Sequence, residues 1–471
     1  MSPTGVRDRA LAAALTLVVS MGCDRDAVVA PTPPPPPEIL ASAVAANPGN
    51  VLSAMVTAEV RFADSIAVHY GLAGGTLEGA APAVVPIDGS VLVPVLGLRA
   101  DTRYDLQIVA YGGGEPLAGP VLELLTGTLP EDLPHYTASG PDPSPGFVVF
   151  AAGPYGLVID NAGRVAWYHR FEHGPGLNFM VQPTGRYTAR PLTGDPTDPA
   201  PWVEIDPRGD TTRTFACARD LQPRFHDLIG LPDHSYWIMC DETRVMDLSA
   251  LGGSASARVT GTVIQHVSAG GGLLFQWSPF DHFAIADLDA ASRGGESVNW
   301  THGNALDLDV DGNLVASFRN LGEITKIDTR TGEIVWRLGG RRNEFTIEGE
   351  VLPPFAGQHG VRVTGAGSLL LLDNLGDPVS SRVERYALDE VNRTARLAAF
   401  YDPSPSVIAS LGGTTQSLSE GRTLVAYGSG GRVEEYDAEG RIVWRIEGNP
   451  GYIFRVQRIH SLYQPGVGSP R

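Results

Sequence analysis

ITKIDTRTGEIVWRLG, residues 324–339, consists of an apolar strand, a polar turn with Asp328 and Gly332, and a second apolar strand carrying Trp336. This pattern predicts a β-hairpin, because Asp and Gly favour turns and Trp buries a large apolar area. The hairpin recurs at residues 156–169 and 433–448, a weaker copy lies at 203–215, and its end recurs at 272–278. A hairpin that repeats along one chain predicts a repeat architecture.

A second kind of hairpin alternates with the first and begins with a histidine. HDLIGLPDHSYWIM begins at His226, HGNALDLDVDGNLVAS at His302 and HGVRVTGAGSLLLLD at His359. One hairpin of each kind makes a four-stranded sheet of about 50 residues, so residues 140–465 hold about six sheets. This predicts an all-β fold ending in a six-bladed β-propeller. The first strand of each blade then lines a central channel, so we expect each histidine at the start of such a strand, with Thr414 or Thr415 in the same place of the last blade.

The composition agrees with many short strands. Gly and Pro number 56 and 37 in 471 residues, which suits turns more than long helices. The net charge of -18 argues against nucleic acid as a partner, because phosphate backbones attract basic surfaces.

The N-terminal residues predict export from a bacterial cell. Arg7 and Arg9 precede an apolar run, residues 10–22, that is too short to span a membrane comfortably and ends at Cys23. Residues 1–23 therefore predict a lipoprotein-type signal peptide with lipidation at Cys23, and ordinary cleavage nearby is the alternative. Residues 24–37 predict a Pro-rich linker. We expect a periplasmic or surface protein of the cell envelope that contacts the membrane only through its lipid anchor.

Residues 38–128 predict a separate β domain, because alternating strands are divided by Gly-rich turns. The stretch GLRADTRYDLQIVAYG resembles a late strand pair of fibronectin type III domains, in which a tyrosine forms a buried corner. Tyr104 would be that tyrosine. We therefore expect an Ig/fibronectin III-like β-sandwich ahead of the propeller.

Two cysteines remain after the signal peptide. Cys217 and Cys240 form a disulfide in one interpretation, since an exported protein meets an oxidising compartment. In the other they are two small buried apolar residues. Their spacing carries no metal signature.

Three converging histidines allow several kinds of chemistry. They could hold zinc with an open position, they could include a nucleophile with proton-handling neighbours, they could bind an anion without chemistry, or they could be polar channel lining. Arg319, at the end of the second strand of the His302 hairpin, favours an anion, because a guanidinium matches sulfate or phosphate oxygens. Asn304 faces the same side of the strand as His302 and could donate a further hydrogen bond. We predict no metal.

An acidic run next to this hairpin resembles a calcium loop. Asp307, Asp309, Asp311 and Gly312 have the D-x-D-x-D-G spacing, but Phe318 stands where an EF-hand has glutamate. We expect a polar hairpin turn.

The elements HDLIGLPD, THGNALDLDVDGNLVASFR, IDTRTGEIVWRLGG, QHGVRV, LLLLDN and YIFRVQRIHSLY resemble those of the bacterial arylsulfate sulfotransferases, the arylsulfotransferase (ASST) family. The resemblance covers about residues 140–465. It implies a small β domain ahead of a six-bladed propeller and an exported enzyme without a cofactor. Such an enzyme moves a sulfuryl group from an aryl sulfate to a phenolic acceptor and needs no nucleotide sulfate donor.

The resemblance also implies roles for the residues singled out above. The transient sulfohistidine maps to His359, the supporting histidines to His226 and His302, the arginine to Arg319 and the asparagine to Asn304. Thr414 is a further candidate for substrate binding. The implied mechanism is ping-pong.

The chain departs from the family pattern beside the nucleophile. The family more often has QHD where this chain has Gly360, and no cysteine near His359 matches the family's disulfide. Two other functions stay open: a non-catalytic cell-envelope propeller that binds an anionic or aryl ligand or a partner, and an aryl sulfate hydrolase. The sequence also leaves a homodimer open.

Overall fold

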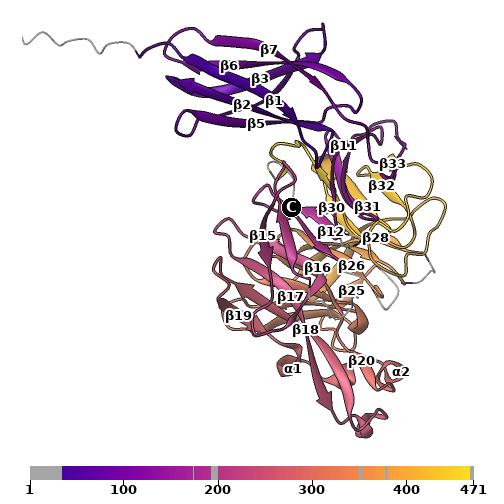
Figure 1. Cartoon of the computed structure of the whole chain (residues 1–471). Coiled ribbons are helices and arrows are strands. Elements are labelled where there is room, and N and C mark those ends of the chain that lie inside the picture. The colour runs from indigo at the N-terminus through magenta and orange to yellow at the C-terminus, as the bar shows by residue number, and fades with distance from the viewer. Residues whose placement is uncertain are drawn as a thin grey trace, which may run out of the picture.

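The computed structural model describes residues 34–172, 174, 176–192, 200–349, 354–376 and 380–466. These residues form an all-β molecule, as expected, with a small N-terminal part and a larger part below it in the view of Figure 1. The predicted signal peptide, Cys23 and most of the Pro-rich linker lie outside the described residues. Within the described residues, no helix has the length and apolarity needed to cross a bilayer.

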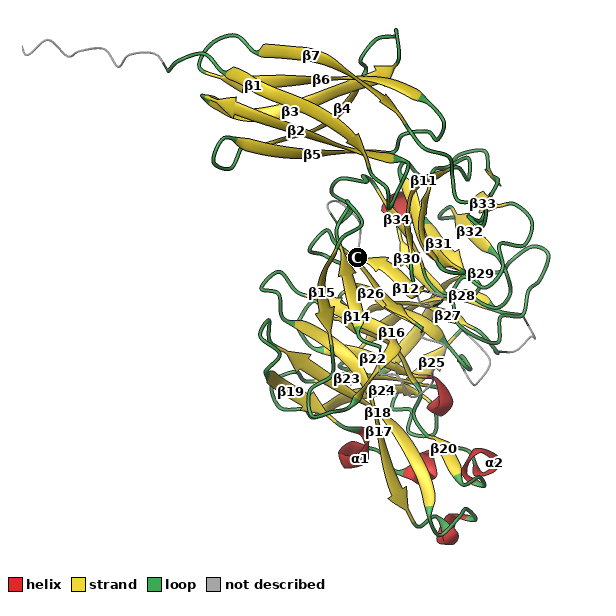
Figure 2. Cartoon of the chain, in the orientation of Figure 1, coloured by secondary structure: helices red, strands yellow, loops and turns green. Residues whose placement is uncertain are grey.

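The N-terminal part consists of two antiparallel sheets and lies at the top of Figure 2. One has the order β1-β2-β5, with β1 (Glu38–Ala46), β2 (Ser53–Arg61) and β5 (Ser90–Leu96). The other has the order β4-β3-β6-β7, with β4 (Gly79–Val84), β3 (Ala63–Leu72), β6 (Arg103–Gly112) and β7 (Leu117–Leu125). Alternate residues of both sheets, such as Val56 and Ile108, form one buried core between them. Tyr104 is buried, and its hydroxyl accepts a hydrogen bond from the Arg99 backbone N–H at 2.9 Å, which is the predicted corner.

The larger part contains six sheets as far as the structure describes it, numbered here sheet 1 to sheet 6 in chain order. Sheet 1 contains β11 (Val165–Arg170), β10 (Tyr155–Ile159), β9 (Phe147–Ala152) and β34 (Val456–Ile459) in that order. Sheet 2 contains β12 (Gly176–Val181), β13 (Tyr187–Pro191), β14 (Trp202–Ile205) and β15 (Thr211–Phe215). Sheet 3 contains β16 (Gln222–Gly230), β17 (Tyr236–Met246), β18 (Ala257–Val267) and β19 (Leu273–Trp277), and β20 (Ser297–Asn299) also pairs with β18.

The remaining three sheets have the same plan. Sheet 4 contains β21 (Gly303–Leu308), β22 (Leu314–Phe318), β23 (Glu323–Ile327) and β24 (Ile334–Gly339). Sheet 5 contains β26 (His359–Gly365), β27 (Ser368–Asp373), β28 (Arg382–Asp389), β29 (Thr394–Tyr401) and β25 (Thr346–Glu348). Sheet 6 contains β30 (Thr414–Ser417), β31 (Thr423–Ala426), β32 (Val433–Tyr436), β33 (Ile442–Ile446) and β8 (Ala138–Ser139).

One edge strand of each sheet takes part in a ring. The strands β34, β12, β16, β21, β26 and β30 contact one another in this order, and β30 contacts β34 again. The ring is closed by β34, which pairs with β9 in sheet 1. At the opposite edge of sheet 6 from the ring, β8 pairs with β33. The inner strand of sheet 1 therefore comes from the C-terminus, which the hairpin pattern did not predict.

The short helices lie in the connections between strands. They are α1 (Pro279–His282), α2 (Ala290–Arg293) and the 3-10 turns η1 (Ser249–Leu251), η2 (Ile285–Asp287), η3 (Arg319–Leu321) and η4 (Ser419–Gly421). Figure 2 shows α1 and α2 beside the far end of sheet 3.

The Asp–Gly–Trp hairpins form as predicted, with β10 paired to β11, β23 to β24 and β32 to β33. The aspartate shapes each turn: Asp160 Oδ1 accepts the backbone N–H of Ala162 and of Arg164 at 3.0 and 2.9 Å. Two of the three tryptophans form hydrogen bonds to a neighbouring sheet. Trp444 of sheet 6 donates its indole N–H to the Asn161 carbonyl of sheet 1 at 2.9 Å, and Trp167 of sheet 1 donates to the Pro207 carbonyl of sheet 2 at 2.8 Å.

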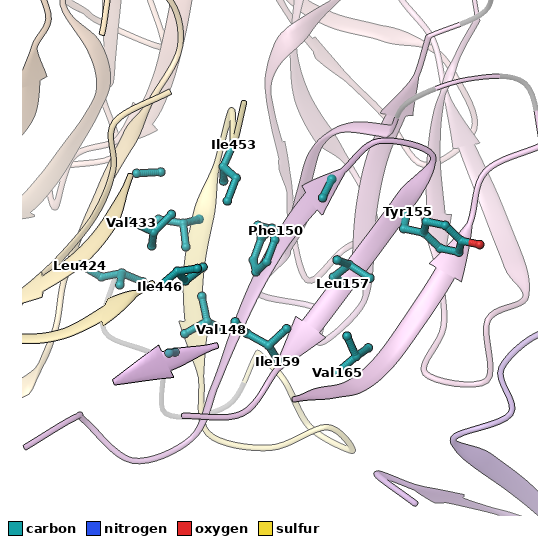
Figure 3. Close-up of a cluster of buried hydrophobic side chains, with 14 of the residues drawn as sticks. Val148, Phe150, Tyr155, Leu157, Ile159, Val165, Leu424, Val433, Ile446 and Ile453 are labelled. Atoms are coloured by element: carbon teal, nitrogen blue, oxygen red, sulfur yellow. The ribbon is translucent and has the colours of Figure 1, made fainter. Parts of the chain in front are cut away.

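The apolar core lies between neighbouring sheets. Figure 3 shows Phe150 and Leu157 of sheet 1 facing Leu424 and Ile446 of sheet 6, and all four are fully or almost fully buried. Each such side chain contributes about 1.5–3 kcal/mol through removal of apolar surface from water. The packing of sheet 6 on sheet 1 thus stabilises the closed ring.

Two further predictions concern particular side chains. Cys217 and Cys240 form a disulfide between the residues after β15 and strand β17, with 6.2 Å between their Cα atoms. The acidic run is a turn between β21 and β22, where Lys326 Nζ forms ion pairs with Asp309 and Asp311 at 2.7 and 2.8 Å. This lysine occupies the carboxylates that a calcium ion would need.

Candidate functional site

The three predicted histidines lie on inner strands of three consecutive sheets. His359 begins β26 and His302 directly precedes β21, as expected, whereas His226 lies in the middle of β16. The expectation that every histidine starts its strand is therefore wrong for His226. The pairing of β16 with β17 is interrupted between Pro223 and Leu228. The pairing of β21 with β22 is also irregular close to His302, and that of β26 with β27 close to His359. Such irregularities redirect side chains, which explains how three different backbone positions aim at one place.

The three imidazoles lie close together. The ring centres of His226 and His302 are 4.9 Å apart, with the rings edge to face. Burial lowers the pKa of His226 well below its usual range, and the nearby Arg224, His302 and His359 lower it further. The repeated position in the sequence thus corresponds to one cluster.

His359 is almost completely buried and is held at both ring nitrogens. Its Nδ1 lies 2.9 Å from the Gly357 carbonyl oxygen and 2.9 Å from Asn374 Oδ1. Its Nε2 accepts the Gly412 backbone N–H at 3.3 Å. Since the Nδ1 partners are acceptors and the Nε2 partner is a donor, the ring carries its proton on Nδ1 and a lone pair on Nε2. Burial, followed by the charge of Arg455, lowers the pKa of His359 to about 3, so the ring is neutral at pH 7.

Asn374 is a site residue that the sequence reasoning missed. Its Nδ2 donates to the carbonyls of Ala409 and Gly412 at 2.6 and 2.9 Å, which leaves Oδ1 for the nucleophile candidate His359. The stretch LLLLDN pointed to this place, because Leu372 in β27 pairs with His359 in β26. Nothing in the sequence shows that residues 409–412 complete the arrangement.

His226 has a different environment. Its Nδ1 accepts a hydrogen bond from Arg224 Nε at 3.2 Å, and its ring stacks on Phe225 with 4.2 Å between ring centres. Arg224 also forms an ion pair with Asp241. Arg224 was not predicted; it stands two residues before His226, in the part of β16 whose pairing with β17 is interrupted.

His302 is only partly buried and lies with Nδ1 2.8 Å from the side-chain nitrogen of Asn299. Burial, Arg224 and Arg319 lower the pKa of His302 to about 3. Arg319 directly follows β22, as predicted, and donates to Asn320 Oδ1 at 3.1 Å and to the Ser410 carbonyl at 3.2 Å. Its charge also lowers the pKa of His359, so Arg319 belongs to the same cluster.

Asn304 and Thr414 are buried beside the cluster. Asn304 Nδ2 donates to the Gln358 carbonyl at 2.7 Å. Asn304 Oδ1 and the Thr414 hydroxyl are buried and have no hydrogen-bond partner among the described residues. Such groups cost free energy unless a ligand or water satisfies them, which fits a binding site.

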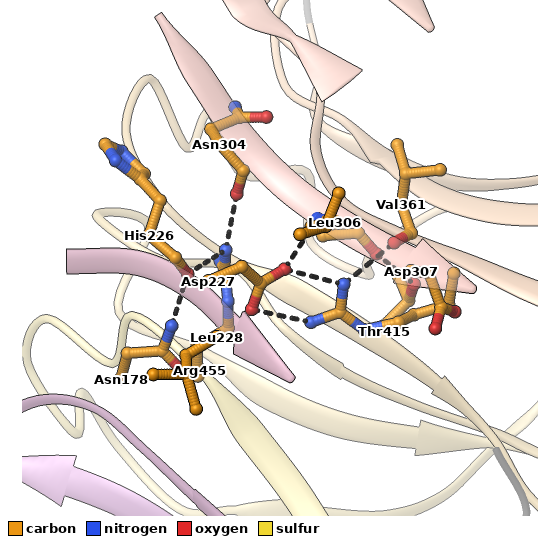
Figure 4. A network of polar contacts seen from close by, with 12 residues as sticks. Asn178, His226, Asp227, Leu228, Asn304, Leu306, Asp307, Val361, Thr415 and Arg455 are labelled. Carbon is orange, nitrogen blue, oxygen red and sulfur yellow. Dashed lines mark hydrogen bonds and ion pairs between the residues drawn. The ribbon is translucent and has the colours of Figure 1, made fainter. Parts of the chain in front are cut away.

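Arg455 is a third unpredicted residue, and it links three sheets beside the histidines. Figure 4 shows its guanidinium reaching the carbonyls of His226 and Asn304, at 3.1 and 2.7 Å, and it also donates to the Gly413 carbonyl at 2.7 Å. Burial lowers the pKa of Arg455 to about 10. Because its acceptors are neutral carbonyls, its positive charge adds to the potential at the cluster. Arg455 is distinct from the ion pair between Arg362 and Asp227, which has contacts of 2.9 and 3.3 Å.

Gly360 contributes through its lack of a side chain. Its φ is +60°, and a Cβ would lie 2.5 Å from the Thr414 Cα and 2.9 Å from the Thr414 hydroxyl. The acid that the family more often has after this histidine would collide with β30 here. The absence of a side chain at Gly360 therefore allows sheets 5 and 6 to approach each other closely.

Aromatic rings and a cleft border the cluster. The Phe454 ring lies 5.6 Å from Phe225 and 5.7 Å from His226, and the half-exposed Tyr452 follows at 6.2 Å from Phe454. A cleft of about 790 Å³ lies beside Arg319 and Gly357. The site therefore combines cations and imidazoles with an aromatic border.

The charges favour an anionic ligand. Arg224, Arg319 and Arg455 all lower histidine pKa values in the cluster. These positive charges would repel a metal cation there. Among the described residues, no group of three or more His, Cys, Asp or Glu side chains is placed to hold a metal ion.

Comparison with known proteins identifies a family. Residues 212–449 match the family model described as arylsulfotransferase (ASST). No curated protein sequence matches the chain. A structure of a protein of unknown function from Bacteroides caccae is 12% identical, with a TM-score of 0.44, and the match covers 66% of this chain and 98% of that one. Virginiamycin B lyase from Staphylococcus aureus is 10% identical, with a TM-score of 0.36, over 66% of this chain and 88% of that one. These TM-scores are too low to carry an argument.

Proposed function

The chain belongs to the arylsulfotransferase family, and we propose that it transfers a sulfuryl group from an aryl sulfate ester to a phenol through a covalent intermediate on His359. Family membership supports arylsulfotransferase-type activity in general. The observation that carries the specific mechanism is the set of hydrogen bonds at His359. Two oxygen acceptors face Nδ1, which places the proton there and the lone pair on Nε2. In the free protein that lone pair accepts the Gly412 backbone N–H, and it exchanges this hydrogen bond for the bond to sulfur when the donor reacts.

In the first half of the reaction, His359 Nε2 bonds to sulfur while the bond from sulfur to the aryl oxygen breaks. The imidazole becomes positively charged, and Asn374 Oδ1 with the Gly357 carbonyl stabilises that charge through Nδ1–H. The phenolate leaves and receives a proton from a neighbouring histidine. In the second half, the same histidine takes the proton of an acceptor phenol, the phenol oxygen bonds to sulfur, and the bond from sulfur to nitrogen breaks.

The cations around His359 suit the charge of the sulfuryl group. Arg319 stabilises the equatorial oxygens, with His226, His302 and Asn304 as further polar partners. Thr414, whose hydroxyl lacks a partner among the described residues, binds another oxygen of the substrate. The aryl group lies against Phe225, Phe454 and Tyr452, because aromatic rings pack with one another at such distances.

The proposal includes the architecture. Sheets 1–6 are the blades of a six-bladed β-propeller, supported by the closed ring of inner strands. The N-terminal pair of sheets is an Ig/fibronectin III-like sandwich, supported by its strand order and by the Tyr104 corner. We also propose export and lipid anchoring at Cys23, for which the sequence pattern is the support.

The experiment uses the purified protein with a chromogenic aryl sulfate, with and without an added phenol. We expect continued phenol release only with the acceptor. Donor alone should release a single equivalent of phenol and add the mass of one sulfuryl group to the peptide containing His359. His359→Ala should abolish both, whereas His460→Ala, a change at an exposed histidine outside the cluster, should leave both unchanged. Continued release of many equivalents without acceptor would favour a hydrolase. No release and no mass gain would favour a non-catalytic binding protein, and full transfer by His359→Ala would exclude the mechanism.

A further inference from the structure

The partner of His226 determines where this ring carries its proton. Arg224 Nε donates to His226 Nδ1 at 3.2 Å, and both side chains are buried. A guanidinium has five donors and no acceptor, and it keeps its proton in proteins. His226 Nδ1 must therefore be the acceptor, and a neutral His226 carries its proton on Nε2.

Arg224 is itself held in place. Its Nη1 forms an ion pair with Asp241, so the guanidinium is fixed at both ends between a carboxylate and the imidazole. Both residues lie in the part of β16 whose pairing with β17 is interrupted, and the hydrogen bond shows that their side chains meet there. The charged or titratable groups that face His226 are Arg224, Arg455, His302 and His359, and each of them disfavours a second proton on the ring.

The other two histidines have partners of different chemistry. His359 Nδ1 faces the oxygens of Gly357 and Asn374, which leaves a lone pair on Nε2. His302 Nδ1 faces the amide of Asn299, which can offer either its nitrogen or its oxygen by rotation. His302 is also the ring with partial exposure, so it is the one that can gain and lose a proton without breaking a fixed contact.

We propose that Arg224 is a positioning residue that holds His226 neutral with its proton on Nε2, so that His226 serves as a hydrogen-bond donor to the sulfuryl group while His302 carries out proton transfer. The inference rests on the proposed function and assigns roles within it. In the first half-reaction, protonated His302 gives its proton to the leaving phenol oxygen. In the second, neutral His302 takes the proton of the acceptor phenol, which restores its first state.

The charge of the bound substrate supports this cycle. Without a ligand, burial, Arg224 and Arg319 lower the pKa of His302 to about 3, so the ring is neutral. An aryl sulfate is an anion, and its charge beside His302 raises this pKa and favours the protonated form that the cycle needs. The same anion cannot give His226 a second proton on Nδ1 while Arg224 donates there. The two supporting histidines therefore differ in function because their second ring nitrogens differ in partner.

The resting protein provides the first test. Long-range proton–nitrogen NMR of protein labelled with ¹⁵N-histidine reports the protonation of each ring nitrogen. We expect His226 with a proton on Nε2 alone and no titration between about pH 5 and pH 8. Arg224→Met, which keeps the stem and removes the donors, should give His226 a titration or the other tautomer, and Arg224→Lys should preserve the wild-type state. A proton on His226 Nδ1 in the wild type, or an unchanged ring in Arg224→Met, would overturn the proposal.

Leaving-group dependence provides the second test. Phenyl sulfate releases a more basic phenolate than 4-nitrophenyl sulfate and depends more on a proton donor. We expect His302→Gln to lose at least about tenfold more activity with phenyl sulfate than with 4-nitrophenyl sulfate, since general acid catalysis contributes about 10²–10⁴ in rate. His226→Gln keeps an N–H donor and should lose similar activity with both. The reverse pattern would contradict the assignment.

Failure of the proposed function gives a different result. If the wild type transfers nothing to any phenol, the sulfuryl-transfer proposal fails, whereas the NMR result on the resting protein still tests the role of Arg224. A variant that does not fold is recognised from its thermal unfolding. If Arg224→Met does not fold, the tautomer of His226 in the wild type and in Arg224→Lys still tests the proposal.

Discussion

Gly360 shows how a single residue departs from the family pattern for a structural reason. It has a left-handed φ of +60°, and β30 passes so close that a Cβ would lie 2.5 Å from the Thr414 backbone. Restoring an acid at this place would therefore push sheets 5 and 6 apart. In its place, Asn374 supplies the oxygen that faces His359 Nδ1.

We predict that Gly360→Ala destabilises the protein by at least about 2 kcal/mol more than Gly312→Ala. Gly312 also has a positive φ, of +81°, but nothing lies within 4 Å of its Cβ position. The control therefore contains the backbone strain without the collision. Denaturant unfolding of both variants measures the difference, and equal losses would show that β30 moves away at little cost.

The buried histidine at position 359 makes the stability depend on pH. Burial and Arg455 lower its pKa in the folded protein to about 3, against an ordinary value of 6.5. Between about pH 3 and pH 6.5 the unfolded chain binds a proton on this ring that the folded protein does not bind. The contribution of this ring to the free energy of unfolding is therefore fully present above pH 6.5, and it is lost as the pH falls below 6.5. The slope from this ring is at most about 1.4 kcal/mol per pH unit.

We therefore predict that His359→Gln flattens the acid side of the stability curve. Denaturant unfolding between about pH 4 and pH 8 compares it with the wild type, and the carboxylates common to both proteins cancel in the difference. A parallel pair of curves would mean that His359 is protonated in the folded protein.

At the scale of elements, the Asp–Gly–Trp hairpin works as a connector as well as a strand pair. The aspartate fixes the turn, and the tryptophan reaches the turn of the neighbouring sheet, as Trp444 does at Asn161. Trp336 is equally buried, yet its indole N–H has no hydrogen-bond partner in the described part of the chain. The repeat is therefore uniform in sequence but not in its contacts.

We expect Trp444→Phe to cost about 1 kcal/mol more than Trp336→Phe. Both changes remove similar apolar volume, but only the first leaves the Asn161 carbonyl without its donor. Thermal and denaturant unfolding of the two variants provide the comparison. A larger loss at Trp336 would show that packing, and not the hydrogen bond, dominates these connections.

At the scale of the whole molecule, covalent and non-covalent contacts join consecutive sheets. The Cys217–Cys240 disulfide connects the end of sheet 2 to sheet 3 and closes a loop with a sequence separation of 23. Both half-cystines lie at or beside a core cluster of these two sheets.

We predict that reduction lowers the free energy of unfolding by about 3 kcal/mol, through the entropy that the unfolded chain regains. Denaturant unfolding with and without a reductant measures this change. A Cys217→Ala/Cys240→Ala double variant should be insensitive to the reductant. No effect on the wild type would mean that the bridge does not restrict the unfolded chain.

The sequence by itself determined the all-β class, the Asp–Gly–Trp hairpins, their buried tryptophans and the repeated histidines. These features depend on neighbours within about ten residues, where turn chemistry and alternation decide the local structure. His359, His302 and Arg319 could be placed for the same reason, since each lies at the end of a recognisable strand.

Only the tertiary structure decided how the ring closes and which partners complete the site. Strand β34 enters sheet 1 from the C-terminus, and Arg455 beside it contacts the His226 carbonyl across a sequence separation of 229. Arg224 is near His226 in sequence, but its role follows from a buried hydrogen bond that no pattern shows. Local patterns fix strands and turns, whereas ring protonation and a buried cation depend on which donors and acceptors the folded chain brings together.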